Sequence, residues 1–230
     1  MSTAQKVIKY CAIGFAMLLI FSIFSGIIAG GIGIMTATKF ISNATNANLI
    51  CVESESPCLK IALGYSDLEI KSGADFSATS DYDRIEVQKE GDNILISEKN
   101  GELISDKSRK TTVTIPENML LTVVDISGGA GRIQIDTMKA EKFNASLGIG
   151  ETIIGSLDAG EVKINTGIGK LDLTLLGEQD DYEIKAEKGI GKMTINDKEI
   201  GSSTTTGSGS RKVEISGGIG EITIKTRRDE

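Results

Sequence analysis

The 230-residue sequence contains no histidine, no tryptophan and only two prolines, and its aromatic residues are few, with six Phe and four Tyr. Histidine is the side chain most used for proton transfer near neutral pH and the commonest metal ligand. Its absence excludes zinc chemistry, Ser-His-Asp triads and Cys-His dyads. The scarcity of aromatic residues also argues against a carbohydrate or peptide platform built on Tyr or Trp.

Acidic residues outnumber basic residues in the part of the chain that follows residue 40. The first acidic residue is Glu53, so all 32 carboxylates follow residue 40, whereas three of the 25 basic residues precede it. The region beyond residue 40 therefore has 22 basic residues and a net charge of −10. Such a surface repels nucleic acid and anionic lipid headgroups, so the sequence predicts no nucleic-acid partner.

One long hydrophobic run stands near the N-terminus, where 29 residues between Lys9 and Lys39 carry no charge. A bilayer core about 30 Å thick requires about 20 apolar helical residues, whereas the apolar region of a cleaved signal peptide has about 7–15. The length favours an uncleaved transmembrane helix over residues 10–38, in contact with membrane lipid. Lys6 and Lys9 before it predict a cytoplasmic tail over 1–9 and an extracytoplasmic C-terminal domain at the plasma membrane.

Residues 39–58 are small and polar and are interpreted as a stalk. Two cysteines, Cys51 and Cys58, lie near its end. An exported domain can oxidise such a pair, but sequence spacing does not establish disulfide geometry. A Cys51–Cys58 disulfide and two separate thiols both stay open.

The 27 glycines fall mostly in short G-x-G pairs that begin a recurring segment. The segments are LGYSDLEI (63–70), GGAGRIQI (128–135), LGIGETII (147–154), LDAGEVKI (157–164), TGIGKLDL (166–173), KGIGKMTI (188–195) and GGIGEITI (217–224). After the glycines, polar and aliphatic residues alternate with period two, which indicates a strand with one buried face. The glycines predicted to form the turns are Gly129, Gly131, Gly148, Gly150, Gly160, Gly167, Gly169, Gly189, Gly191, Gly218 and Gly220.

The spacing of these glycines predicts the architecture. The second glycine advances from 131 to 150 to 169, with a half-step at Gly160, and the later intervals lengthen to 22 and 29 residues. A period near 20 indicates a single-stranded β-solenoid or β-roll over residues 59–226, in which successive turns pair in parallel, with a short tail at 227–230. An antiparallel sandwich or meander, whose turns recur about every 8–12 residues, is the alternative. The recurrence of the glycines in both sequence and spacing favours the all-β solenoid.

The region before the regular repeats has a different pattern. RIEVQKEGDNILISEKN predicts a β-hairpin, and TTVTIPENMLLTVVDIS predicts two strands around a Pro-Glu-Asn turn. Because the end of a solenoid exposes unpaired backbone groups, we expect this region to cap that edge.

The hairpin, the stretch TTVTIPENMLLTVVDISGGAG and the tandem G-x-G segments together resemble the bacterial "putative adhesin" domain-of-unknown-function family, of the β-strand-repeat type with LiaG-like members. The resemblance covers roughly residues 59–226. It implies a right-handed β-solenoid in the cell envelope, often behind a membrane helix. It supplies no catalytic, cofactor or metal residues.

The acidic cluster Glu178, Asp180 and Asp181 is the best candidate for cation binding or acid chemistry, but it lies in a predicted loop and lacks the residue order of a calcium loop. A solvated turn explains it better, so the sequence predicts no enzyme, cofactor or metal. The leading hypothesis is a non-catalytic, membrane-anchored envelope protein whose solenoid is a structural or interaction surface of the adhesin type. Two alternatives stay open: an accessory role in envelope-stress sensing through a membrane-protein partner, and an exported polysaccharide-active enzyme.

Overall fold

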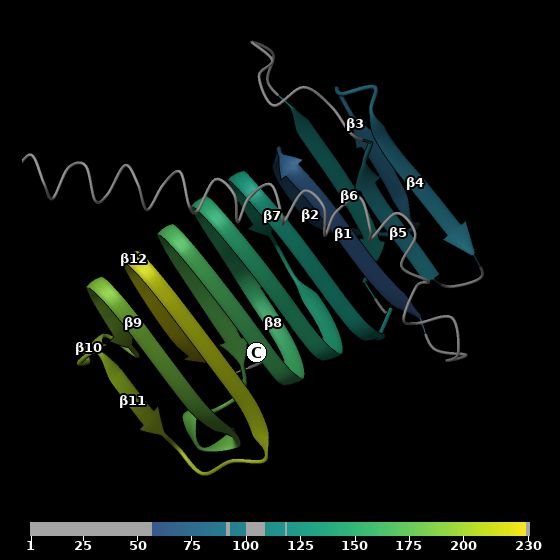
Figure 1. Cartoon of the computed structure of the whole chain (residues 1–230). Coiled ribbons are helices and arrows are strands. Elements are labelled where there is room, and N and C mark those ends of the chain that lie inside the picture. The colour runs from purple at the N-terminus through teal and green to yellow at the C-terminus, as the bar shows by residue number, and fades with distance from the viewer. Residues whose placement is uncertain (1–56, 91–92, 100–108, 118, 229–230) are drawn as a thin grey trace, which may run out of the picture. The chain divides into compact units, whose positions relative to one another are not determined.

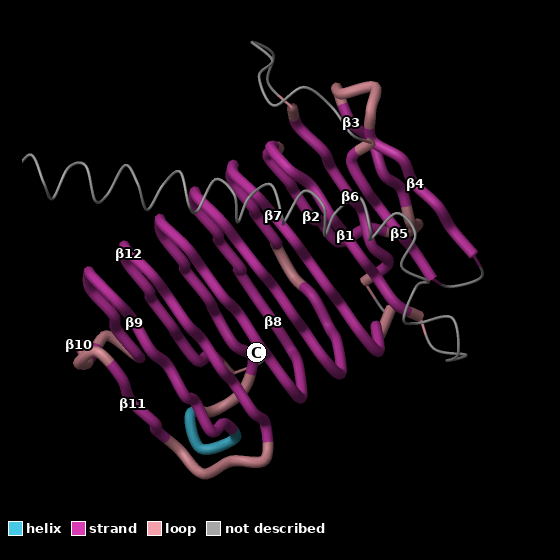
Figure 2. The backbone as a smooth tube through the Cα atoms, in the orientation of Figure 1, coloured by secondary structure: helices cyan, strands magenta, loops and turns pink. Residues whose placement is uncertain are grey.

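The computed structural model describes residues 57–90, 93–99, 109–117 and 119–228, which belong to one compact unit. Within them the chain forms strands almost throughout, with one short 3-10 helix, η1 (Figures 1 and 2). The elements are β1 (Cys58–Tyr65), β2 (Asp67–Gly73), β3 (Ser77–Ser80), β4 (Ile85–Glu90), β5 (Asn93–Glu98), β6 (Lys110–Pro116), β7 (Leu121–Ile135), β8 (Met138–Leu176), η1 (Gln179–Asp181), β9 (Tyr182–Ile195), β10 (Lys198–Glu199), β11 (Ser203–Thr206) and β12 (Arg211–Arg227).

The all-β class predicted for the domain is confirmed in the described part of the chain. No helix within that part is long and apolar enough to cross a membrane. The predicted tail (1–9), the predicted transmembrane helix (10–38) and all but the last two residues of the predicted stalk (39–58) lie outside it. They stay predictions.

The 19-residue period of the sequence matches the register of a parallel sheet, in which each residue lies opposite the residue 19 positions further along the chain. β7 pairs in parallel with the first part of β8, from Leu121 opposite Ala140 to Ile135 opposite Ile154. The rest of β8 keeps the same offset, because Gly167 and Gly169 lie against the carbonyl groups of Gly148 and Gly150. We call each repeating unit of about 19 residues a rung.

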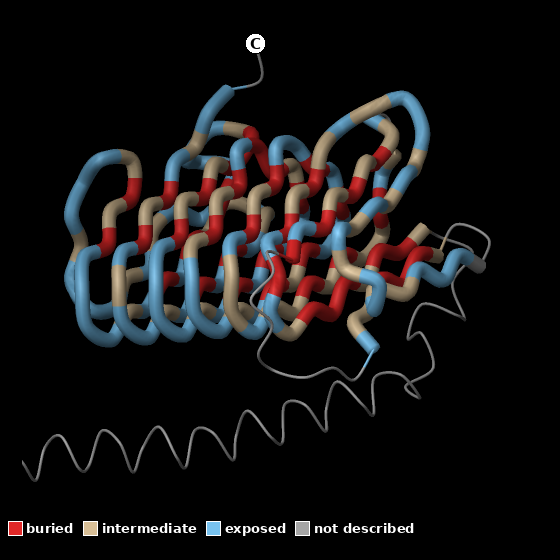
Figure 3. Tube along the Cα trace, turned by 90° about the horizontal axis from the view of Figure 1, so that it is seen from above, coloured by how far each residue is buried: buried red, intermediate tan, exposed pale blue. Residues whose placement is uncertain are grey.

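The aliphatic residues that alternate along each rung form the core. Ile164, Leu171 and Leu173 of β8 are almost completely buried, as are their counterparts on the neighbouring strands. Burying a side chain of this size contributes about 1.5–3 kcal/mol. Figure 3 shows the buried residues gathered inside the stacked strands, with a row of exposed bends along one long side.

The rungs do not all stack in chain order. β12, the C-terminal strand, lies between β8 and β9 and pairs in parallel with both, as Figure 1 shows. Glu214 of β12 is therefore flanked by Lys163 on one side and Lys185 on the other. The sequence predicted that successive turns pair with each other, and at this end that expectation was wrong.

The charges on the outer face give a physical reason for this order. Had β9 paired directly with β8 in the same register, Lys163 would adjoin Lys185, and like charges on neighbouring strands are destabilising. With β12 inserted, Glu214 separates them and lies 3.8 Å from Lys163. A second position repeats the arrangement with the signs reversed, where Lys212 separates Glu161 from Glu183.

Both ends of the stack finish in antiparallel strands. At one end β5 and β6 pair in parallel with β1 and β2, and β4 and β3 then add in antiparallel. At the other end β10 and β11 pair antiparallel with β9. The hairpin predicted from RIEV and NILI is confirmed as β4 and β5. Short strands of this kind limit the exposed edge available to another chain.

Candidate interaction surface

The surface with the clearest functional character begins at the G-x-G corners, where each rung bends. Gly150 and Gly169 both have φ of +145°, which L-residues with side chains rarely adopt. A Cβ at Gly169 would also clash with the carbonyl oxygen of Gly150 on the next rung. Glycine is therefore required at these positions by backbone conformation and by close stacking.

Ten of the eleven predicted turn glycines lie at these corners, stacked against the equivalent corner of an adjacent rung. Gly160 does not. It lies within the strand segment that precedes the corner at 166–169, and a Cβ there would meet the carbonyl oxygen of Glu141 at 3.2 Å. The half-step at Gly160 was therefore a misalignment, because the G-x-G corners repeat at 19 residues and Gly160 is not one of them.

The middle residue of each corner points outward, and these residues stack into a line. Tyr65 pairs with Ala130, Ala130 with Ile149, and Ile219 with both Ile168 and Ile190. We call the line the corner ridge. In spatial order it comprises Tyr65 (51% exposed), Ala130 (intermediate), Ile149 (55%), Ile168 (49%), Ile219 (49%) and Ile190 (72%).

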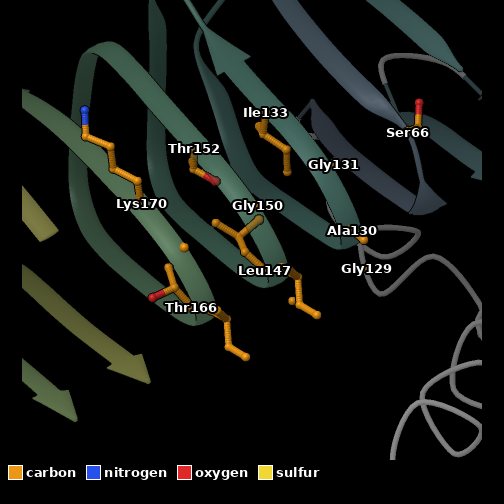
Figure 4. A pocket seen from close by; sticks show the side chains of 15 residues that line it. Ser66, Gly129, Ala130, Gly131, Ile133, Leu147, Gly150, Thr152, Thr166 and Lys170 are labelled. Atoms are coloured by element: carbon orange, nitrogen blue, oxygen red, sulfur yellow. The ribbon is translucent and has the colours of Figure 1, made fainter. Parts of the chain in front are cut away.

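Six rungs about 4.8 Å apart make the corner ridge roughly 24 Å long. Single exposed apolar side chains are ordinary on protein surfaces, whereas a continuous apolar row is less common. Beside the ridge the glycines leave a shallow hollow lined by Ile133, Leu147 and Thr166 (Figure 4). The hollow adds apolar surface beside the ridge.

A second line follows the corner ridge, two residues further along each rung. We call it the charge ladder: Asp67, Arg132, Glu151, Lys170, Glu221 and Lys192 in spatial order. Its sign alternates at every step. The backbone N–H of Arg132 donates to Asp67 Oδ1 at 2.8 Å, and the Arg132 guanidinium pairs with Glu151. The alternation depends on β12, because Lys170 and Lys192 would otherwise be neighbours.

Lys170 at the centre of the charge ladder is held in its charged form. Its ammonium group lies 2.7 Å from Asp172, and this hydrogen bond is the main reason that the pKa of Lys170 is raised, with smaller contributions from Glu151 and Glu221. Lys170 remains solvent-exposed.

The aromatic side chains of the domain do not form a binding platform. Tyr182 and Phe143 are fully buried, and the guanidinium of Arg109 lies 4.3 Å from the centre of the Tyr82 ring. Phe76 packs against the core. Tyr65 is largely exposed, and it contributes to the corner ridge.

Tyr182 instead takes part in a hydrogen-bond network at the beginning of β12, the strand inserted between β8 and β9. Its hydroxyl donates to the carbonyl oxygen of Leu176, and Arg211 Nη1 donates to the same carbonyl at 2.8 Å and to the Tyr182 hydroxyl at 3.0 Å. Arg211 also pairs with Asp158 at 3.1 Å. These contacts join the end of β8 to the beginnings of β9 and β12. Burial raises the pKa of Tyr182, against the opposing effect of Arg211.

The remaining candidates from the sequence show no binding geometry. Glu178 directly precedes η1, which contains Asp180 and Asp181. The backbone N–H of Glu178 donates to Asp181 Oδ2 at 2.8 Å, and the Glu178 carboxylate pairs with Arg228 at 2.8 Å. No group of three metal-ligating side chains occurs among the residues that the structure describes. Cys58 is buried, but Cys51 lies outside the described residues, so their disulfide stays a prediction.

No family model matches the chain, and no curated protein matches it. Solved structures do resemble it, and two of them serve as examples. A "putative cell adhesion protein" from Clostridium sporogenes ATCC 15579 is 22% identical over 75% of this chain and 93% of its own, with a TM-score of 0.56. A "putative adhesin" from Bacteroides fragilis NCTC 9343 is 16% identical over 73% and 92%, with a TM-score of 0.30. The first of these shares the fold.

The corner ridge was not predicted from the sequence. The repeat consensus places no constraint on the middle residue of each G-x-G, although it is Ile in four of the corners. Aliphatic side chains between two turn glycines are unusual because a bend exposes them to solvent. The repeated isoleucine at this position was therefore the sequence feature that could have predicted the corner ridge.

Proposed function

We propose that this chain is a non-catalytic envelope protein that presents the corner ridge as an adhesin-like contact surface. In this proposal the domain is a right-handed β-solenoid, and the hydrophobic segment 10–38 anchors it in the plasma membrane with the domain outside. The observation that carries the proposal is the corner ridge itself, a row of exposed or partly exposed apolar side chains on bends whose glycines adopt positive φ and stack closely on the next rung.

The contact role is supported by the contrast between the ridge and the rest of the surface. Elsewhere the described outer face is dominated by paired charges and by Ser and Thr, which interact well with water. Apolar groups are kept exposed in a row only where burial against a partner repays the exposure. Rigid strands on both sides fix the ridge, so little conformational entropy is lost on binding.

The experiment uses beads coated with the full chain and intact cells of the strain that carries it. Ile168→Asp places a charge in the middle of the corner ridge, and Val87→Asp makes the same change at an exposed apolar residue of β4, away from the ridge. We expect wild-type and Val87→Asp beads to be retained on the cells, and Ile168→Asp beads to be retained at least about tenfold less, the loss typical of a central contact residue. Equal retention of all three, or of none, would contradict the proposal.

The location is tested separately. A cysteine introduced at Ser208, an exposed residue between β11 and β12, should react with a membrane-impermeant maleimide in intact cells. Protection until the cells are opened would place the domain inside and overturn the extracytoplasmic part of the proposal.

A further inference from the structure

We propose that the partner of the corner ridge is the corner ridge of a second copy of this chain, the two copies being related by a two-fold axis that runs across the ridge. This inference rests on the proposed contact function and specifies its partner. It is carried by the self-complementarity of the charge ladder.

The charge ladder has six positions and strictly alternating signs, beginning with Asp67 and ending with Lys192. A two-fold axis perpendicular to the ridge lays the two ladders face to face in opposite directions. Asp67 then faces Lys192 of the second copy, and Glu151 faces Lys170 of the second copy. Because the number of positions is even, every one of the six contacts joins opposite charges. Such an interface is isologous, the commonest form in symmetric dimers.

The same arrangement brings the two apolar rows together. Tyr65 faces Ile190 of the second copy, and Ile149 faces Ile168 of the second copy. Ala130, the smallest residue of the ridge, faces Ile219 rather than another alanine. Burial of these side chains supplies the attraction, and the ladder supplies the register.

The register is strongly specified. Sliding one copy by a single rung turns every ladder contact into a like-charge contact, and a parallel arrangement in register does the same. Sliding by two rungs restores opposite charges but leaves two rungs unmatched at the ends. Like charges opposed at an interface exclude wrong partners and wrong registers.

The ridge is narrow, so the contact is smaller than a standard stable interface of about 1,600 Å². We expect a weak, reversible dimer with a dissociation constant on the order of 0.1–1 mM, so that it is detected at chain concentrations in that range. Alternating exposed charges also make its dissociation constant rise with added salt, since contacts of this kind are screened.

The first test is sedimentation equilibrium of the full chain in detergent. Wild type and Val87→Asp should dimerise equally, and Ile168→Asp should dimerise at least tenfold more weakly. Circular dichroism checks that all three fold. A wild-type chain that stays monomeric at 1 mM, or an Ile168→Asp chain that dimerises like wild type, would overturn the inference.

The second test reads the orientation by disulfide trapping. In a background in which Cys11 and Cys51 are replaced by Ser and Cys58 by Ala, one chain carries Tyr65→Cys and a second chain, of different size, carries Ile190→Cys. The two-fold arrangement brings 65 and 190 together, whereas the two copies of position 65 lie at opposite ends of the ridge, about 24 Å apart. Mixed products should exceed either homodimer at least tenfold; homodimers in excess, equal yields or no product would refute it.

The bead assay separates this inference from the proposed function. Wild-type beads should bind cells that carry the protein and lose at least tenfold in retention on cells whose gene is deleted. If beads bind deleted cells equally well through an intact ridge, the partner is another molecule: the second-copy inference fails and the contact function stands. If the chain dimerises through the ridge but beads bind neither kind of cell, the contact function fails.

Discussion

The middle of the domain and its C-terminal end are built from the same repeat but stacked by different rules. From β7 through β8 the rungs follow chain order with a constant 19-residue offset. Beyond Leu176 the chain passes over one position, forms β9, and returns to place β12 in the vacant position between β8 and β9. Identical hydrophobic patterns therefore permit two orders of assembly, and the outer charges distinguish them.

The difference between the two regions separates two roles: glycine and aliphatic residues form the rung, whereas charged residues on its outer face favour particular neighbouring rungs. Corner glycines and alternating aliphatic residues make any two rungs compatible, since each offers the same corner and the same buried face. Glu214, Lys212 and Glu221 of β12 complement both neighbours at once. Small cross-strand terms of about 0.2–1 kcal/mol each, summed over several positions, are sufficient to favour one order over its alternative.

The largest expected effect is on stability, and it tests whether β12 contributes as much to the free energy of unfolding as the middle of the stack does. Ile215 of β12 and Ile164 of β8 are both buried and occupy paired positions. Ile215→Ala and Ile164→Ala should each lower the free energy of unfolding by about 3 kcal/mol, because each leaves a cavity in the core. Urea denaturation measures both. A cost below about 1 kcal/mol for Ile215→Ala alone would show that β12 is only loosely attached.

Substitution of a corner glycine should lower the free energy of unfolding by somewhat less than these core substitutions do. Gly169→Ala places a side chain at φ +145° and against the carbonyl of Gly150, so we expect a loss of at least about 2 kcal/mol. Gly160→Ala is the matched control, because Gly160 lies in a strand away from the corners, and its cost should stay within about 1 kcal/mol. Equal losses in thermal or urea unfolding would contradict the assignment of the corner.

A charge reversal on β12 tests the ordering rule. Glu214→Lys replaces two favourable contacts with two repulsive ones and should cost about 0.5–1 kcal/mol, decreasing as salt is added. The triple variant Lys163→Glu, Glu214→Lys, Lys185→Glu restores the alternation, because the outer neighbours of Lys163 and Lys185 are the uncharged Asn144 and Thr205. Its stability should return to that of wild type. A triple variant no more stable than the single one would show that these charges do not act across the strands.

The smallest effect is expected in alkaline solution. Burial raises the pKa of Tyr182, and the Asp172 hydrogen bond raises the pKa of Lys170, so both groups hold their protons more tightly when folded. Their contributions are fully present below the unfolded values of about 10 and are lost as the pH rises through the folded values. The Tm should fall above about pH 10, and Tyr182→Phe should make that fall shallower. If the Tm of Tyr182→Phe falls with pH as steeply as that of wild type, ionisation of the Tyr182 phenol does not contribute to the loss of stability.

Much of the domain could be predicted from local pattern. The strands, the corners and the capping hairpin follow from alternation and glycine placement, which are local properties of each rung. The position of β12 could not, because repeats of equal pattern do not state which neighbour each will choose. The corner ridge lay within reach, since Ile149, Ile168 and Ile190 stand between paired glycines, but its continuity depends on β12 supplying Ile219.

The most direct test of this account is a nuclear Overhauser measurement between isoleucine methyl groups along the corner ridge. With β12 inserted, Ile219 lies between Ile168 and Ile190, so it should show contacts to both, and Ile168 and Ile190, separated by two rungs or about 9.6 Å, should show none at short mixing times. Stacking in chain order would instead give a contact between Ile168 and Ile190 and none between Ile168 and Ile219. That result would remove the alternating charge ladder and, with it, the two-fold contact.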